Sequence, residues 1–304
     1  MRFFLLIFIC VAVFFYMSFN SSGSKRTDAL YERAEAGEVM AQKQLGAQML
    51  SGGGVVQNYH EAEKWLRQAA EQGDAEAQGL LGVIYQNGLG REVDYNEAFK
   101  WFKLSAEQGL LESQAFLAAM YEEGRGTMIN YDEAVKWYSL AADRDYAIAQ
   151  NSLGMMYLVG RGVPQDYAKG RELIRTAAAR GYPRALYNLA YINEYGIGGE
   201  VNLDDAIKFY KNSASQDFAD AQYRLAMLYL EGLHVAQDSE EAFKFFSQAA
   251  QQDHAAATYQ LGQMYLQGQG TVAEPQEARA LFTKACDLGE ERACEALKTT
   301  PFTQ

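Results

Sequence analysis

The side chains that most often carry catalysis or bind metal ions are few and scattered in this chain. Its 304 residues include three histidines and three cysteines, namely His60, His234, His254, Cys10, Cys286 and Cys294. The histidines do not form a set at zinc-site spacing, and no G-x-S-x-G motif supplies a serine nucleophile. Neighbouring carboxylates, which can act as general acid and base, occur at Asp204–Asp205 and Glu240–Glu241. Both pairs begin predicted helices, where acidic residues favour the helix dipole. We therefore expect no enzymatic activity, no metal and no cofactor.

The charge balance limits the kinds of partner. The chain has 39 Asp and Glu against 27 Lys and Arg, which gives a formal net charge of −12. A nucleic-acid-binding surface needs an excess of positive charge, so we expect no nucleic-acid partner. Glycine is frequent, with 27 residues against 4 prolines, and a helical protein can hold so many only at special positions.

One segment recurs along most of the chain with a period of 36 residues. The string LGVIYQNGLG at 81–90 is followed by LAAMYEEGRG at 117–126 and LGMMYLVGRG at 153–162. Related strings complete a series of seven copies, numbered one to seven below, and occupy 45–54, 189–198, 225–234 and 261–270. Half-copies stand before and after the array, at 28–37 and 291–298.

Each copy contains two segments with helical periodicity. In the first segment, apolar residues follow the spacing of one helix face, as in Ala77, Leu81, Ile84 and Tyr85. The second segment has a similar apolar stripe, as in Ala98, Trp101, Phe102 and Ala106. Two short helices cannot bury both apolar faces alone, so neighbouring copies must stack. The sequence predicts an all-α fold, a right-handed α-solenoid of antiparallel helix pairs.

Glycine recurs in four columns of the repeat. One column stands just after the first helix of every copy, where a residue with positive φ commonly ends a helix; its members are Gly52, Gly88, Gly124, Gly160, Gly196, Gly232 and Gly268. A second column follows two residues later, with His234 as its exception. A third closes the second helix and holds Asp145, Asp217 and Asp253 in three copies. The fourth, glycine or alanine within the first helix, predicts close approach of another helix.

The N-terminus has the composition of a targeting segment. From Phe3 to Phe19 every residue except Ser18 is apolar, and Arg2 supplies a positive flank. This run exceeds the usual export h-region of about 7–15 residues and reaches the lower limit of a spanning helix, about 17 residues. An uncleaved signal anchor and a cleaved signal peptide both fit these features. Either one predicts that the repeats are exported from the cytoplasm to the cell envelope. In a bacterium they would lie in the periplasm.

The sequence therefore divides into four segments. We expect a signal anchor or signal peptide at 1–24 and a half-repeat helix at 25–37. Seven repeats occupy 38–289, and a capping half-repeat with a tail occupies 290–304. A solenoid grows by adding copies, so this organisation replaces the two domains that the length alone suggests.

The repeated motifs resemble the Sel-one-like repeat, a relative of the tetratricopeptide repeat. The resemblance rests on A-x-x-x-L-G-x-x-Y-x-x-G-x-G, then D-Y-x-E-A-x-x-W and A-A-x-x-G, and covers about residues 28–298. Copy five departs from this pattern with Asn193 in the tyrosine column and with Leu203 at the position of Tyr95. Copies six and seven depart at His234, Ser239, Pro275 and Leu281. The resemblance implies an adaptor that assembles complexes, often at bacterial envelopes or in the endoplasmic reticulum, and not an enzyme.

The string KACDLGEERACEAL resembles the cysteine-rich Helicobacter subgroup of this family. In that subgroup cysteines eight residues apart are disulfide-bonded, which implies a bridge between Cys286 and Cys294. An antiparallel helical hairpin with its turn at 287–292 could bring the Cα atoms of Cys286 and Cys294 within the separation that a disulfide needs. The alternative is that both are small residues in alanine columns, since Cys286 aligns with Ala250.

A partner should bind at positions that the repeat does not fix. Three columns of the first helix lie roughly opposite its core column, on the side that lines the concave face of related solenoids. In copies four to seven these columns are rich in Tyr, Met and Leu, residues that favour protein interfaces. The predicted partner-binding residues are Met155, Leu158, Tyr187, Tyr191, Tyr223, Met227, Leu230, Tyr259 and Leu266. Lateral packing between neighbouring first helices is the alternative explanation.

The sequence as a whole favours a non-enzymatic adaptor. We expect it to bind a protein or peptide on its concave face, to contact the membrane through its N-terminal segment and to have no small-molecule substrate. A binding module for cell-wall glycan (peptidoglycan) is the alternative, because tyrosines also stack on sugars. A hydrolase of the envelope lacks any supporting constellation of residues.

Overall fold

The structure is a computed structural model that describes residues 23–302. This part of the chain forms 16 α-helices and no strand, which confirms the all-α prediction. The first helices of copies one to seven are α3 (Val39–Ser51), α5 (Ala75–Asn87), α7 (Leu111–Glu123), α9 (Ala147–Val159), α11 (Pro183–Tyr195), α13 (Ala219–Glu231) and α15 (Ala255–Gln267). The second helices are α4 (Tyr59–Glu71), α6 (Tyr95–Glu107), α8 (Tyr131–Ala142), α10 (Tyr167–Ala179), α12 (Leu203–Ala214), α14 (Ser239–Gln251) and α16 (Pro275–Asp287). The half-copies supply α2 (Gly23–Glu35) and α17 (Glu291–Thr299).

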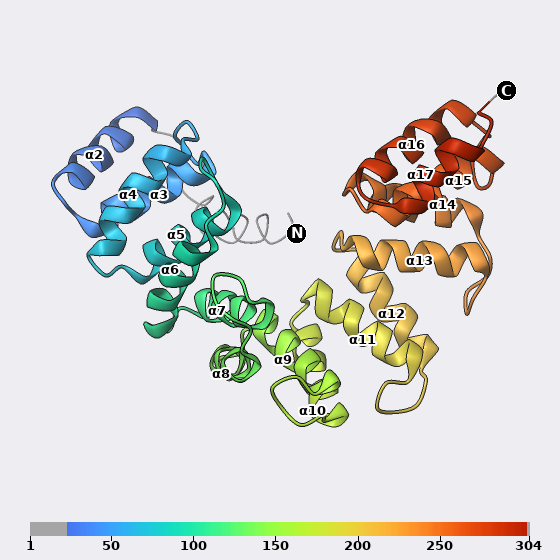
Figure 1. Cartoon of the computed structure of the whole chain (residues 1–304), viewed down its shortest axis with the longest axis horizontal. Coiled ribbons are helices and arrows are strands. Elements are labelled where there is room, and N and C mark those ends of the chain that lie inside the picture. Colours follow the sequence, from blue (N-terminus) through green and yellow to red (C-terminus); the bar gives the residue numbers. More distant parts are fainter. Residues whose placement is uncertain (1–22, 303–304) are drawn as a thin grey trace. The chain divides into compact units, whose positions relative to one another are not determined.

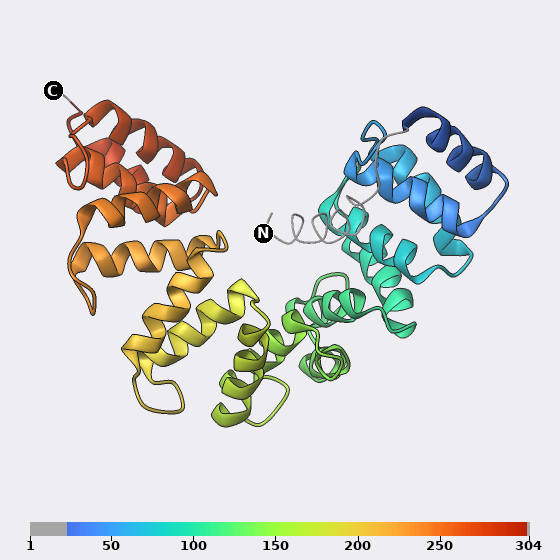
Figure 2. The ribbon, with the colours of Figure 1, turned by 180° about the vertical axis from the view of Figure 1, so that it is seen from behind.

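The chain divides into two compact units. Unit 1 runs to Ala149 and includes Arg161–Pro164, while unit 2 comprises Gln150–Gly160 and the chain from Gln165 onward. Within each unit a helix packs mainly on the helix before it and the helix after it, as the ribbons in Figures 1 and 2 show. This sequential stacking of helix pairs is the predicted solenoid architecture.

Each helix pair is held by a second-helix residue that enters a space left by a small residue in the first helix. Phe102 of α6 is fully buried. A Cβ at Gly82 of α5 would lie 2.6 Å from Cδ1 of the Phe102 ring, which leaves no room for any side chain. Phe282 packs in the same way against Gly262. The close helix approach predicted from this glycine column is confirmed.

The turns between helices depend on positive φ angles. Gly196 ends α11 at φ 64°, and its N–H donates to the carbonyl of Ile192. Gly126 has a φ of 69°, and a Cβ there would lie only 2.1 Å from the carbonyl oxygen of Tyr95. The residues that replace glycine in these columns adopt the same conformation, with φ between 58° and 66° at Asp145, Asp217, His234 and Asp253. The backbone geometry is therefore kept where the sequence departs from glycine.

Side-chain caps mark the start of six of the seven second helices, all except α16. Asn202 precedes α12, and its Oδ1 accepts a hydrogen bond from the N–H of Asp205 at 3.1 Å. Asp204 and Asp205 occupy the first turn of α12, so this acidic pair lies where it favours the helix dipole, as predicted.

The C-terminal half-copy is joined covalently to copy seven. Cys286 near the end of α16 and Cys294 in α17 form a disulfide, with their Cα atoms 4.9 Å apart. The bridge implied by the family resemblance is thus present in the structure.

Of the predicted targeting segment, 1–24, residues 1–22 lie outside the described part of the chain. Its last two residues, Gly23 and Ser24, begin α2. Among the helices of residues 23–302, none combines the length and the apolar content needed to cross a membrane.

Candidate partner-binding surface

All nine predicted partner-binding residues belong to unit 2 and lie on its first helices. Met155 and Leu158 are on α9, Tyr187 and Tyr191 on α11, and the other five are on α13 and α15. We call the side of these helices that carries the three columns the first-helix face. The structure separates its members into packed and exposed side chains.

One column of tyrosines packs against the second helix of its own copy. The Tyr187 ring lies 5.6 Å from the ring of Tyr210, and the Tyr223 ring lies 5.8 Å from that of Phe246. Tyr259 repeats the arrangement against Phe282 at 5.5 Å. Each ring therefore covers the aromatic side chain at the centre of its helix pair, and burial raises the pKa of Tyr187 above its usual value.

The same three tyrosines also contact the start of the next copy. Tyr187 lies 5.5 Å from Phe218, and Tyr223 stacks on His254 at 4.8 Å, with each partner at the N-cap of the following first helix. The guanidinium of Arg292 lies 4.9 Å from the centre of the Tyr259 ring. These contacts are the lateral packing named above as the alternative explanation, so this column contributes half-buried rings whose main contacts are internal.

The middle column is more exposed. Tyr191 is 42% exposed and Met155 37% exposed. Met227, Leu230 and Leu266 are half-buried against the core of copies six and seven. Leu158 is only 6% exposed, because its side chain packs over Gly170 of α10, where a Cβ would lie 2.7 Å from the Leu158 Cδ2 atom. Leu158 is therefore a core residue and not part of the exposed surface, which corrects its assignment to the partner-binding set.

The structure adds Tyr195 to this surface. Its side chain is 52% exposed, and its ring lies 4.4 Å from that of Tyr191. Tyr195 follows the third predicted column by one residue, so a slightly wider arc of the helix includes it. Together Tyr191 and Tyr195 form the most exposed aromatic pair on the first-helix face.

A partly buried ion pair contacts the aromatic pair through Tyr195. Arg224 of α13 donates through both Nε and Nη2 to the carboxylate of Glu194, with 3.1 Å between Nε and Oε2. The Tyr210 hydroxyl donates to the same Oε2 at 2.6 Å. Arg224 Nη2 also donates to the Tyr195 hydroxyl at 3.2 Å. This network links α11, α12 and α13 and fixes the position of the Tyr195 ring.

His254 and Asp220 form a second polar link between first helices. His254 Nδ1 accepts from the N–H of Ala257, so Nε2 carries a proton and faces Asp220 Oδ1 at 3.4 Å. This hydrogen bond holds the pKa of Asp220 below its usual value. His254 is thus occupied in capping α15 and in supporting the ring of Tyr223.

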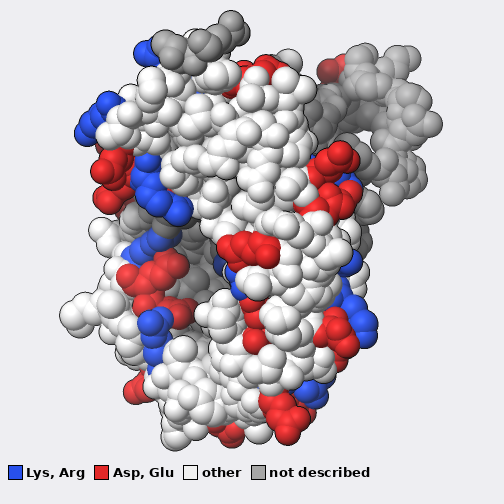
Figure 3. All heavy atoms as spheres, turned by 90° about the vertical axis from the view of Figure 1, so that its right-hand side faces the viewer, with Lys and Arg blue, Asp and Glu red and all other residues white. Residues whose placement is uncertain are grey.

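The face carries aromatic, apolar and paired polar groups, which suit binding better than catalysis. Within residues 23–302, no group of three His, Cys, Asp or Glu side chains is placed to hold a metal ion. On the side drawn in Figure 3, basic and acidic side chains lie interspersed over a largely uncharged surface. Tyr, Met and Arg are also the residue types enriched at protein interfaces.

The fold defines a helical-repeat solenoid. Residues 39–290 match the Sel1 repeat model as seven consecutive copies of 36 residues, which begin at 39, 75, 111, 147, 183, 219 and 255. The chain belongs to the Sel1 repeat family. Proteins of this family are generally non-enzymatic scaffolds for protein interactions.

Solved structures of similar proteins agree with this assignment. A Sel1 repeat protein from Oxalobacter formigenes is 32% identical, with a TM-score of 0.70, over 95% of this chain and 84% of that one. The c5321 protein of uropathogenic Escherichia coli, described as a protective antigen with an SLR fold, is 35% identical with a TM-score of 0.68. That match covers 89% of this chain but only 58% of the length of c5321. Yeast Tom70 shares the fold alone. It is 16% identical with a TM-score of 0.57, and the match covers 91% of this chain and 58% of Tom70. No curated protein sequence matches the chain.

Proposed function

We propose that this protein is a non-enzymatic adaptor that binds a peptide or protein segment on the first-helix face of unit 2. The observation that carries the proposal is the exposed pair Tyr191 and Tyr195, with Arg224 hydrogen-bonded to the Tyr195 hydroxyl. Met155 and Met227 occupy the position of Tyr191 in copies four and six. An exposed aromatic pair loses little conformational entropy on binding and gives a large contact area. The half-buried tyrosine column supports this surface and forms its edge.

The cellular setting is part of the proposal. The apolar N-terminal run supports export or anchoring, so we place the repeats in the cell envelope, where the adaptor would assemble a complex. The acidic net charge of −12 supports a protein partner over nucleic acid.

The test is a crosslinking pulldown from membranes with the full chain, compared with the double variant Tyr191→Ser/Tyr195→Ser. We expect the variant to lose most partner capture while it keeps the helical circular dichroism of the parent. Tyr167→Ser is the matched control, since Tyr167 is also 42% exposed but lies on the second helix α10. Equal capture by the double variant and the parent would refute the proposed surface.

The same proteins distinguish the glycan alternative. A parallel pulldown on purified peptidoglycan should retain neither the parent nor the double variant. Retention of the parent, lost in the double variant, would replace the protein partner by cell-wall glycan.

A further inference from the structure

Copy five lacks an aromatic ring that most other copies place between neighbouring helix pairs. The first helices of copies two, three, four, six and seven carry a tyrosine at the same position, namely Tyr85, Tyr121, Tyr157, Tyr229 and Tyr265. In copy five this position is Asn193, whose short side chain is buried and accepts a hydrogen bond from Arg171 at 3.1 Å. The place of one tyrosine ring is therefore not filled by residue 193.

The neighbouring copy six shows what surrounds such a ring. Tyr229 stacks on Phe245 of its own second helix, with the ring centres 6.0 Å apart and the planes 6° from parallel. Lys211, from the second helix of the preceding copy, places its Nζ 5.8 Å from the centre of the Tyr229 ring. The tyrosine thus lies between an aromatic ring and a cation.

Copy two also places a cation beside the ring and adds hydrogen bonds. Arg67 of the preceding second helix donates to the Tyr85 hydroxyl, and that hydroxyl donates to Glu63 Oε1 at 3.1 Å. The guanidinium of Arg91 lies 3.9 Å from the ring centre. The phenol of Tyr85 is therefore held by a cation at its ring and by its hydroxyl group, which both accepts and donates a hydrogen bond.

Copy five keeps two of the groups that surround such a ring. Phe209 and Arg175 stand 36 residues before Phe245 and Lys211, so they are the corresponding aromatic and cationic residues. Within the described part of the chain Arg175 has no hydrogen-bond or ion-pair partner, whereas its counterpart Arg67 bonds to Tyr85 and Glu63. The aromatic ring and the cation are both present, and no tyrosine lies between them.

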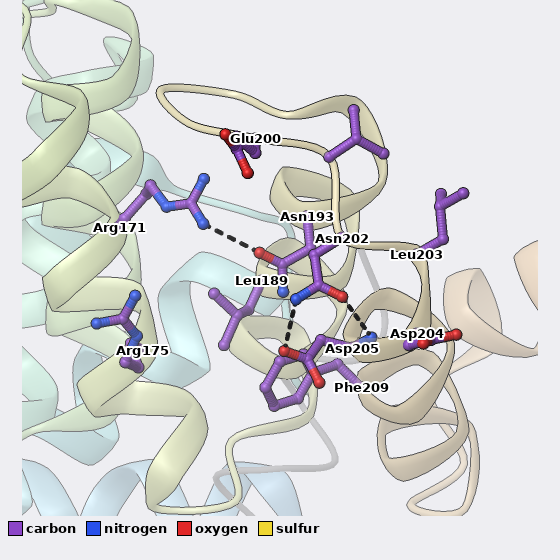
Figure 4. A pocket seen from close by; sticks show the side chains of 11 residues that line it. Arg171, Arg175, Leu189, Asn193, Glu200, Asn202, Leu203, Asp204, Asp205 and Phe209 are labelled. Atoms are coloured by element: carbon purple, nitrogen blue, oxygen red, sulfur yellow. Dashed lines mark hydrogen bonds between the residues drawn. The ribbon is translucent and has the colours of Figure 1, made fainter.

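An open cavity of about 860 Å³ lies beside Asn193 and is lined by Phe209 and Arg175. Figure 4 shows Arg171 and Arg175 of α10 on one side, Phe209 and Asp205 of α12 on the other, and Asn193 of α11 between them. The cavity reaches Leu189, a core residue, at its floor. The corresponding groove of copies one and two is lined by charged and polar side chains of α4 and by Arg91, without Tyr85 or a core residue.

We propose that this cavity binds a phenol ring supplied from outside the chain, either the side chain of a tyrosine in a polypeptide or a free phenolic compound. The ring stacks on Phe209 as Tyr229 stacks on Phe245, and Arg175 approaches it as Lys211 approaches Tyr229. The site lies apart from the first-helix face and does not depend on the function proposed for it.

The charges of the cavity favour a neutral phenol over an anion. Two arginines line it, but Glu200, Asp204 and Asp205 line it as well. A phenolic hydroxyl can accept from an arginine and donate to a carboxylate, as the hydroxyl of Tyr85 does with Arg67 and Glu63. Arg171 stands at the position that corresponds to Glu63, so the carboxylate that accepts from the phenol here is one of the three acidic side chains that line the cavity. A carboxylate or phosphate ligand would meet like charge from the three acidic side chains.

The test titrates the full chain with p-cresol and, separately, with the capped tripeptide acetyl-Ala-Tyr-Ala-amide. Methyl resonances of Leu189 and Leu203 report binding, since both side chains line the cavity. We expect saturable shifts with at least one probe and several-fold weaker binding of the matched peptide with Phe in place of Tyr. Binding of p-cresol alone identifies a free phenolic compound as the ligand, and binding of the peptide identifies a polypeptide tyrosine.

Two variants decide whether the shifts come from this cavity. Asn193→Tyr supplies the ring from the chain itself, so it should abolish the shifts and raise the melting temperature. Arg175→Gln should weaken binding several-fold, whereas Arg279→Gln, a residue that does not line the cavity, should leave it unchanged. Absence of saturable binding of both probes, or full binding by Asn193→Tyr, would overturn the proposal.

Discussion

His234 is a residue in a conformation that favours glycine. Its φ is 63°, while the six other copies place glycine at this position of the turn. A side chain in the left-handed region costs about 1–2 kcal/mol. We expect His234→Gly to stabilise copy six by about 1 kcal/mol, measured as slower amide exchange in α13 and α14.

Gly270→Ala is the opposite change at the same position of copy seven. An alanine Cβ there would lie 2.1 Å from the Ser239 carbonyl oxygen, so strain adds to the cost of positive φ. We expect destabilisation by more than about 1 kcal/mol in urea unfolding. A neutral effect of both variants would show that the turn does not require its φ angle.

Asp220 makes the folding stability of the chain depend on pH. Its pKa is lowered in the folded state by the hydrogen bond from His254, so the carboxylate stabilises the fold above its ordinary pKa of about 3.9. This stabilisation is lost as the pH falls through the lowered pKa, because protonation then breaks the hydrogen bond to the charged form. Asp220 is half exposed, so we expect less than about 1 kcal/mol.

Asp220→Asn tests this linkage. The parent should exceed the variant in urea midpoint at pH 7 and at pH 5, and the difference should narrow at pH 3. A difference that is the same at pH 7 and pH 3 would contradict the role of the Asp220 carboxylate.

At the scale of elements, the tyrosine column of the first-helix face serves packing. Tyr223 lies between Phe246 of α14 and His254 at the start of α15, so its removal opens a space between two elements. We expect Tyr223→Ala to destabilise unit 2 by about 2 kcal/mol, which is below the 3–5 kcal/mol typical of a fully buried aromatic residue. Tyr191→Ala should stay within about 0.5 kcal/mol of the parent in the same urea titration, because that ring is largely exposed.

The disulfide determines whether the short helix α17 stays docked. It joins α16 and α17 across a sequence separation of eight residues. Closing a loop of this length adds about 2–3 kcal/mol to the free energy of unfolding. We expect reduction, or the double variant Cys286→Ala/Cys294→Ala, to increase amide exchange in α17 while α3–α6 are unchanged. Two reactive thiols besides Cys10 in the folded, untreated chain would show that the bridge does not form.

At the scale of the whole molecule, stability should be local along the chain. Each helix packs mainly on its neighbours in sequence, so loss of one copy removes contacts only from adjacent copies. Phe282 is fully buried in copy seven, and Phe282→Ala should cost about 3–5 kcal/mol there. We expect hydrogen exchange to rise in α15–α17 and to remain at the parent level in unit 1. An equal rise in both units would indicate a single cooperative fold.

The departures of copy five show what sequence and structure each contribute. The 36-residue period identifies Asn193 as an exception to the tyrosine column, and this can be read directly from the chain. That the exception opens a cavity depends on Phe209 and Arg175, which lie on different helices and remain in place without the ring. The same limit explains Leu158, which shares a helical column with the half-buried Leu230 and Leu266 but is covered by α10.

The sequence by itself determined the helices, their boundaries at the glycine columns and the sequential stacking of seven copies. These features follow from local physical rules, namely apolar spacing on a helix, capping and positive φ, repeated often enough to exclude coincidence. Only the tertiary structure decided which tyrosines are packed and which are exposed, added Tyr195 to the surface and showed the vacancy beside Asn193. The exposure of a side chain depends on residues from neighbouring helices, and helical periodicity within one segment does not contain that information.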